Sequence, residues 1–200
     1  MPEECIFFPY SWHQDNNEKE ITAIRIYGLD IHNKNVCVRV NDFTPYVYIE
    51  LPSNIEWNVI QAQKLGNKLD ELLGESKPLL KRLMYKKRLY YAHFNDGKRQ
   101  LFPYLFCSFS CSNDIWSLRN KTRKPINIVG TGIIELKIHE WNASPILQLT
   151  SLKNIPTAGW IRFIGTLLLN ERKKTSCDYE YLVKWKDLKE FKQDIIACPL

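Results

Sequence analysis

The 200-residue sequence lacks any apolar run approaching the roughly 18 to 20 residues that a membrane-spanning helix needs. Its first residues also lack the basic stretch followed by an apolar stretch that marks a secretory signal peptide. No internal repeat or low-complexity tract is present, and 44% of the residues are hydrophobic, which is enough to build a core. We therefore expect a soluble, intracellular and monomeric protein with no membrane partner.

Disulfide and metal chemistry are not indicated either. The six cysteines are spread along the chain without a signal peptide, so we predict reduced thiols rather than a disulfide framework. The CSFSC segment at 107–111 has a gap found in zinc sites, but no Cys or His pair at matching spacing follows it. The four histidines lie far apart in the sequence. We predict no metal site in this chain.

Motifs for catalysis are equally scarce. The chain contains neither the glycine-rich loop that cradles phosphates nor the G-x-S-x-G elbow of serine hydrolases. Its lone G-x-G, Gly130 to Gly132, is typical of a bend between strands. The 22 acidic residues are dispersed, whereas two-metal catalysis needs several carboxylates that converge on Mg²⁺. We predict no catalytic residue and no cofactor within these 200 residues.

What the sequence does contain is a moderate excess of positive charge, +6 from 28 basic and 22 acidic residues. Such a balance permits binding to nucleic acid without requiring it. The cations gather between Lys77 and Arg99, where eight of them face a single acid, Asp96, and alternate with aromatic residues. The candidate nucleic-acid-binding residues are Lys81, Arg82, Lys86, Lys87, Arg88, Tyr90, Tyr91, Lys98 and Arg99.

Two interpretations of this basic segment stay open. Cations neutralise phosphates and aromatic faces stack on bases, so the segment has what a platform for single strands requires. Alternatively, the aromatic residues face the core and the cations are the solvated side of an ordinary strand, because side chains alternate between the two faces of a sheet. A second basic cluster, at 172–174, is more typical of a solvated loop.

Alternating patterns predict strands at 21–27, 36–40 and 46–51, which we expect to form one antiparallel sheet. Helical spacing from about residue 55 to 73 predicts a helix with Ser53 or Asn54 as its cap. The remaining predicted elements are strands at 83–94 and 101–109 around a turn at 95–97, a helix from Ser112 or Asn113, one further strand supplied by 126–129 with 133–138, a helix at 144–152 capped by Ser144, and strands at 159–163 and 178–184.

From residue 36 to 138 the order is strand, helix, strand, strand, helix, strand. This order predicts an α+β fold with a ferredoxin-like, split βαβ middle of the kind used by RNA-recognition modules. We expect this middle to pack on an antiparallel sheet formed by strands from both ends of the chain. The expected divisions are 1–52 (with 36–51 also starting the middle unit), 53–140 and 141–200.

Three segments carry a resemblance to a known family. ITAIRIYG at 21–28 followed by FTPYVYI at 43–49 resembles the opening of family B DNA polymerases. ASPILQLTSLKNI at 143–155 with GWI at 159–161 is similar to a later helix and strand of that family, and CDYEYLV at 177–183 is similar to the strand before its exonuclease domain. The order and spacing match those of delta-like enzymes from eukaryotes and large DNA viruses.

The resemblance implies an amino-terminal domain that lies beside the template strand, with single-stranded DNA or RNA and the other polymerase domains as partners. It implies that the exonuclease motif F-D-I-E and its Mg²⁺ ions would come after 194–200, and that the protein acts in the nucleus or at a viral replication site. Two alternatives stay open. The chain is a free-standing single-strand binder or a remnant of a split polymerase gene, or it only braces the exonuclease and palm domains.

Overall fold

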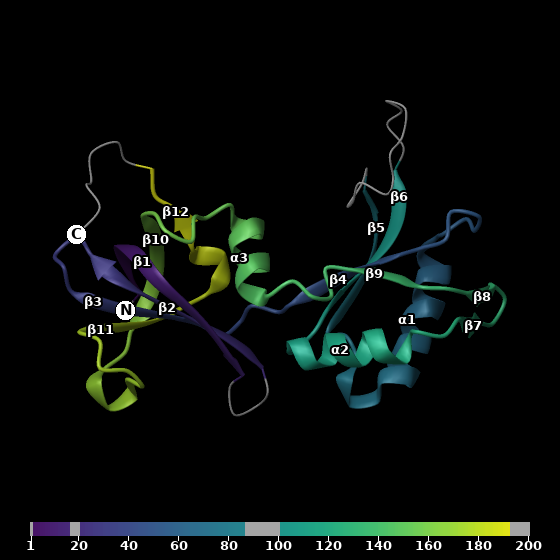
Figure 1. The fold of residues 1–200 in the computed structure, drawn as a ribbon, viewed down its shortest axis with the longest axis horizontal. Coiled ribbons are helices and arrows are strands. Elements are labelled where there is room, and N and C mark those ends of the chain that lie inside the picture. Colours follow the sequence, from purple (N-terminus) through teal and green to yellow (C-terminus); the bar gives the residue numbers. More distant parts are fainter. Residues whose placement is uncertain (1, 17–20, 87–100, 193–200) are drawn as a thin grey trace. The chain divides into compact units, whose positions relative to one another are not determined.

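The computed structural model describes residues 2–16, 21–86 and 101–192, and these form two compact units (Figure 1). The first unit combines the amino-terminal residues up to Thr44 with those from Ser144 onward, and the second runs from Pro45 to Ala143. The chain therefore leaves the first unit, builds the second, and returns. No helix in the described parts is long and apolar enough to cross a membrane.

The first unit is a closed barrel of antiparallel and parallel strands. Its sheet order is β1-β2-β3-β11-β10, and β1 also pairs with β10, so that the sheet closes on itself, with β12 alongside β10. Among the described strands, β3 and β11 pair in parallel and the other pairs are antiparallel. The strands are β1 (Pro2–Asn16), β2 (Thr22–Asp30), β3 (Asn35–Val40), β10 (Ile161–Leu167), β11 (Tyr179–Val183) and β12 (Lys189–Glu190).

Alternating apolar side chains fill the inside of this barrel. Phe7, Ile24, Ile26 and Phe163 are fully buried, and the rings of Phe7 and Phe163 meet edge to face at 5.4 Å. Closure leaves the main barrel strands without an unpaired edge, which otherwise favours aggregation. The core of this unit is thus assembled from strands more than 120 residues apart in the chain.

The long strand β1 was not predicted from the sequence. It contains Pro9, which cannot donate a ladder hydrogen bond, and the pairing with β2 shifts between Pro9 and Ser11 to accommodate it. Gly28 lies opposite Pro9, and a Cβ atom there would come within 2.3 Å of the Phe8 carbonyl oxygen. A proline at a bulge and a glycine facing it together allow this close approach of the two strands.

Helix α3 (Pro145–Lys153) and two single 3₁₀ turns, Asn170–Arg172 and Trp185–Asp187, complete the first unit. The Ser144 side chain accepts a hydrogen bond from the Leu147 amide at 3.2 Å, as the sequence predicted. Asn154 ends the helix in the left-handed conformation (φ 51°), which asparagine adopts more readily than most residues. The predicted strands at 159–163 and 178–184 appear as β10 and β11.

The second unit contains a four-stranded antiparallel sheet in the order β5-β6-β4-β9, two helices and a small hairpin, β7–β8. Together with the barrel, these sheets and helices confirm the predicted α+β class. The elements of the second unit are β4 (Tyr46–Glu50), α1 (Val59–Leu73), a 3₁₀ turn (Gly74–Ser76), β5 (Leu80–Lys86), β6 (Phe102–Ser108), α2 (Ser112–Lys121), β7 (Ile126–Ile128), β8 (Gly132–Ile134) and β9 (Lys137–His139).

One face of this sheet packs against both helices. Val47 and Ile49 of β4 join Leu105 and Cys107 of β6 in a core cluster with buried residues of the helices. The helical members of that cluster are Ala62, Leu65, Leu69, Leu73, Ile115 and Leu118. Because side chains alternate along a strand, the neighbours of the four strand residues lie on the opposite, helix-free face.

Two local expectations were wrong. The strand predicted at 46–51 does not extend the sheet of β2 and β3, because β4 pairs with β6 and β9 in the second unit. Pro45 is the first residue of the second unit. The interruption predicted at 41–45 therefore separates two different sheets, and not two strands of one sheet. Helix α1 is capped by Asn58, not by Ser53 or Asn54, and the Asn58 side chain accepts from the amides of Ile60 and Gln61.

Candidate nucleic-acid interface

The helix-free face of the sheet β5-β6-β4-β9 carries a connected group of rings. Tyr46 and Tyr48 of β4 lie across from Phe106 of β6, each with its centroid 5.4 Å from that of Phe106. Tyr48 also meets Tyr104 edge to face at 6.3 Å, and Tyr104 meets His139 of β9 at 6.2 Å. The two inner strands of the sheet therefore present an aromatic layer, which we call the aromatic face.

Most of this aromatic layer is closed to solvent. Tyr104 is fully buried, and Tyr46 and Tyr48 are each 8% exposed, whereas Phe102 and Phe106 are half-buried. Edge-to-face pairs contribute about 0.5 to 1.5 kcal/mol beyond the burial of their area. The layer is thus a packed support for this face, and its partly open members lie on β6.

The predicted binding residues of β5 divide between the two faces. Lys81 lies on the helix side, where its ammonium group is paired with Asp70 of α1 and donates to the Gly66 carbonyl oxygen at 3.2 Å. The Lys81 stem passes over Gly66, where an added Cβ would lie 3.1 Å from its Cδ. Tyr85, on the same side, donates its hydroxyl to the Trp57 carbonyl. The polar groups of Lys81 and Tyr85 therefore bind other residues of the same unit.

Arg82 and Lys86 lie on the helix-free face. Arg82 is exposed and pairs across the sheet with Phe106. Lys86 is half-buried, donates to the Tyr48 hydroxyl at 2.7 Å and places its ammonium group 4.1 Å from the centroid of the Tyr48 ring. A cation over an aromatic face is attracted by the ring quadrupole. The structure therefore brings two of the predicted cations together with the aromatic face.

An acidic group lies near these cations. Burial raises the pKa of the Glu140 carboxyl above its ordinary value, and the charge of Lys86 opposes this effect. At the β9 edge, the Glu50 carboxylate lies 2.6 Å from Nε2 of His139 and 3.7 Å from Nζ of Lys137. The carboxylates of Glu140 and Glu50 thus offset part of the positive charge of Lys86 and Lys137.

The other predicted binding residues lie outside the described part of the chain. They are Lys87, Arg88, Tyr90, Tyr91, Lys98 and Arg99, together with the turn expected at 95–97.

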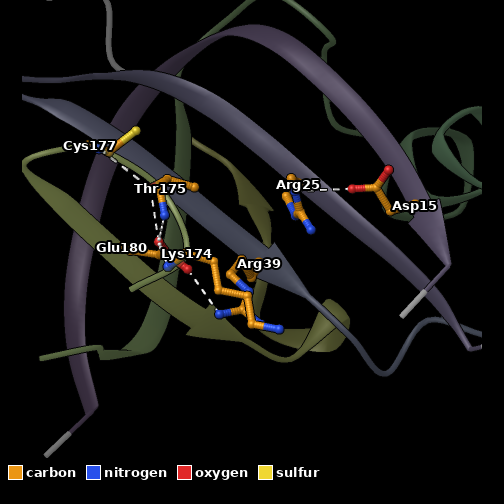
Figure 2. Close-up of polar contacts among 7 residues, drawn as sticks. All are labelled: Asp15, Arg25, Arg39, Lys174, Thr175, Cys177 and Glu180. Carbon is orange, nitrogen blue, oxygen red and sulfur yellow. Dashed lines mark hydrogen bonds and ion pairs between the residues drawn. The ribbon is translucent and has the colours of Figure 1, made fainter. Parts of the chain in front are cut away.

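The second basic cluster, at 172–174, belongs to the barrel. Lys173 donates to the carbonyl oxygens of Cys177 and Asp178 at 3.2 and 2.6 Å, so its ammonium group helps to hold the loop between β10 and β11. The amides of Lys174 and Thr175 donate to the Glu180 carboxylate at 2.9 and 3.0 Å (Figure 2). This loop is organised around Glu180.

Two features of the described residues were not predicted from the sequence. Asp178 and Glu180 have D-x-E spacing at β11, but Glu180 is fully buried against Arg39 and Asp178 accepts the amide of Asn35. Within the described ranges, no three His, Cys, Asp or Glu side chains could hold a metal ion. The aromatic face was the second omission, although the alternating aromatics at 46–48 and 102–106 were a signal for it.

No protein-family profile matches the chain. In sequence it is similar to DNA polymerase 037L of Invertebrate iridescent virus 6, at 37% identity over 207 residues, a match that covers 90% of this chain and 16% of that protein. It is 36% identical over 206 residues to DNA polymerase 120R of Invertebrate iridescent virus 3, covering 96% of this chain and 17% of the relative. The DNA polymerase delta catalytic subunit of Caenorhabditis elegans is 23% identical over 205 residues, with 89% and 18% coverage.

The chain spans less than a fifth of the length of these relatives. Its fold resembles part of the family B DNA polymerase from Pyrobaculum calidifontis, with a TM-score of 0.60 at 14% identity, over 93% of this chain and 21% of the archaeal one. The sequence relatives confirm the resemblance found at 21–28, 43–49 and 143–183. The resemblance to family B DNA polymerases is thus confirmed: in sequence the chain matches a part of viral and delta DNA polymerases, and in fold a part of an archaeal family B enzyme, as an amino-terminal domain of such an enzyme does.

Proposed function

We propose that this chain is the template-side domain of a DNA-directed DNA polymerase that acts in DNA replication, in the nucleus or at a viral replication site. In this role it binds single-stranded template and holds the exonuclease and polymerase domains in place, without supplying catalytic residues. The Mg²⁺ ions of catalysis would then be bound by those other domains. The identity of the relatives as DNA polymerases and the small share of their length that this chain covers support this assignment of roles.

The observation that carries the binding proposal is the placement of Arg82 and Lys86 on the helix-free side of the sheet, over the aromatic face. The element order β4-α1-β5-β6-α2-β9, with sheet order β5-β6-β4-β9, supports a ferredoxin-like unit. RNA-recognition modules of this kind bind single strands on the sheet face, with aromatic residues of the inner strands beneath the bases.

In the proposed complex the exposed guanidinium of Arg82 contacts a phosphate. Lys86 is held by Tyr48, so its charge is fixed at the face and loses little side-chain entropy when a strand binds. The half-buried rings of Phe102 and Phe106 are the described aromatic residues available for stacking, while Tyr46, Tyr48 and Tyr104 support them from below. Lys81 acts structurally through Asp70.

The test is the affinity of the full chain for a fluorescent single-stranded oligonucleotide at several salt concentrations. The double variant Arg82→Gln with Lys86→Gln is compared with the matched control Lys64→Gln with Lys68→Gln, which removes the same charge from α1. The salt slope is the slope of the logarithm of the binding constant against the logarithm of the salt concentration. Losing two phosphate contacts lowers its magnitude by about 1.4, since each contact with a single strand contributes about 0.7. The control pair leaves the slope near the wild-type value.

Two alternatives give different results. A purely structural brace shows no difference between the two double variants, and that outcome would overturn the binding proposal. A free-standing binder or a remnant of a split gene binds oligonucleotide equally well but does not stimulate or stabilise a polymerase assembled from the remaining domains of a relative. A reconstitution assay with those domains therefore separates the polymerase role from isolated binding.

A further inference from the structure

Helix α2 and the segment after β9 form a second cluster of aromatic and basic side chains in the same unit. Trp116 and Arg119 are one helical turn apart on α2, so that they share a face. The Trp116 and Trp141 rings meet edge to face with centroids 4.9 Å apart. The guanidinium carbon of Arg119 lies 4.0 Å from the centroid of Trp141 and 6.0 Å from that of Trp116. We call these three residues the tryptophan–arginine cluster.

The cluster is open to solvent. Trp116 is 46% exposed, although burying an indole is one of the most favourable contributions a side chain can make. Arg119 and Trp141 are half-buried, and the guanidinium carbon lies over the indole ring. Guanidinium groups stack on aromatic faces and on nucleic-acid bases while their edges donate hydrogen bonds.

Positive charge is concentrated in the sequence that contains α2 and the residues after it. Between Asp114 and Glu135 the sequence contains four cations and no acid. Cations at the carboxyl end of a helix are stabilised by its dipole, which accounts for Arg119 and Lys121 in the last turn of α2. Lys121 also donates to the Leu72 carbonyl at 2.7 Å.

Arg123 and Lys124 directly follow the end of α2, and both are exposed. Neither forms an ion pair with an acidic side chain in the described ranges. Two exposed cations that follow α2 in the sequence, together with an open aromatic cluster on that helix, have the pattern that a single strand recognises, with phosphates on the cations and bases on the rings.

We propose that the tryptophan–arginine cluster, with Arg123 and Lys124, is a second contact surface for single-stranded nucleic acid. It is separate from the aromatic face, because α2 packs through Ile115 and Leu118 on the opposite side of the sheet. A base stacks on Trp116 and on the outer plane of Arg119, while Arg123 and Lys124 bind flanking phosphates. Duplex DNA fits poorly, since its base faces are already stacked. This second surface rests on the proposed function and extends it, because one bound nucleic-acid strand then contacts both sides of this unit.

The test uses the full chain, an oligothymidylate of about 20 nucleotides and the same sequence as a duplex. Trp116→Ala weakens binding to the single strand by five- to a hundredfold, as loss of one stacked base does. Trp116→Phe restores part of the affinity because it keeps a ring. Arg123→Gln with Lys124→Gln lowers the magnitude of the salt slope by about 1.4. Lys64→Gln with Lys68→Gln is the control for net charge.

Each outcome decides between the two surfaces. If Trp116→Ala and the Arg123 and Lys124 double variant both bind as the wild type does, the second surface is overturned, whatever the result at Arg82 and Lys86. If they lose affinity while the Arg82 and Lys86 variant does not, the second surface stands and the aromatic face is not the binding site. Equal loss of affinity for duplex and single strand would also overturn the stacking role. Urea midpoints confirm that each variant is folded.

Discussion

The carboxylate of Glu180 is fully buried in the barrel, and Nη1 of Arg39, on the parallel neighbouring strand, lies 2.9 Å from it. The same carboxylate accepts the Thr175 hydroxyl at 2.8 Å and the amides of Lys174 and Thr175 (Figure 2). One buried charge thus joins the parallel pair β3 and β11 to the loop that precedes β11. This arrangement supplies the first two predictions.

Removing Arg39 should destabilise the chain strongly, because it leaves the buried charge of Glu180 without its counter-ion. We expect Arg39→Met to lower the free energy of unfolding by about 3 kcal/mol. The double variant Arg39→Met with Glu180→Gln should recover part of this loss, since Gln keeps acceptors for Thr175 without the charge. Urea denaturation of the two single variants and the double variant measures the coupling.

The control for this pair is Arg25→Met. Arg25 lies 3.1 Å from Asp15, but both side chains are substantially exposed, so this pair contributes less than about 1 kcal/mol (Figure 2). If Arg39→Met and Arg25→Met lowered the free energy of unfolding by the same small amount, the buried ion pair of Glu180 would not stabilise the barrel as we infer.

The Glu180 contribution should also depend on pH. Burial raises the pKa of Glu180, but hydrogen bonds from Thr175 and from the Lys174 amide, together with Arg39, outweigh burial and leave the pKa lowered. A lowered pKa in the folded state contributes stability that is present above the ordinary value of about 4.3 and is lost as the pH falls through the folded pKa.

We therefore expect the stability difference between the wild type and Glu180→Gln to be constant from pH 7 to about 5 and to shrink below about pH 4.3. Urea midpoints of both proteins, measured in steps from pH 7 to pH 3, give this difference directly. A difference that grew on acidification would show that the folded pKa is raised instead.

Two glycines should respond oppositely to substitution by alanine. A Cβ at Gly28 would lie 2.3 Å from a backbone oxygen of β1, which cannot move without opening the barrel, so Gly28→Ala should cost about 2 to 3 kcal/mol. A Cβ at Gly66 would meet only the flexible stem of Lys81 at 3.1 Å, while alanine gains up to about 1 kcal/mol of helix propensity. The midpoint temperature of thermal unfolding should fall for Gly28→Ala. For Gly66→Ala it should rise or stay unchanged.

The cap of α1 provides the fourth prediction. Asn58 accepts two amides of the first turn, and Gln61 accepts the Asn58 amide in return at 3.3 Å, so Asn58→Ala should lower stability by about 1 kcal/mol. Asn54→Ala, at the position that the sequence pattern favoured, is the matched control and should change stability by less than about 0.5 kcal/mol. Comparable losses at both sites would argue that α1 begins earlier than Val59.

Local features were predicted best. Ser144, Pro145 and Asn154 delimit α3 because capping depends only on side chains within one turn of the helix end. The cap of α1 was misplaced by four or five residues, since Ser53, Asn54 and Asn58 all have the chemistry for it. Only the packing of Trp57, whose indole donates to the Pro52 carbonyl at 2.9 Å, distinguishes the true start.

Three things followed from the sequence alone: the strand periodicities, the α+β class, and the relationship to family B polymerases. Each depends on residue types that are near one another in the chain or on motifs in a fixed order. Only the tertiary structure decided that β1 closes a barrel with β10, that β4 leaves the sheet of β3, and that Lys81 faces α1 while Arg82 and Lys86 face the aromatic layer. Pairing partners and the choice of face depend on the shared burial of segments that can be more than 120 residues apart, and no local pattern carries that information.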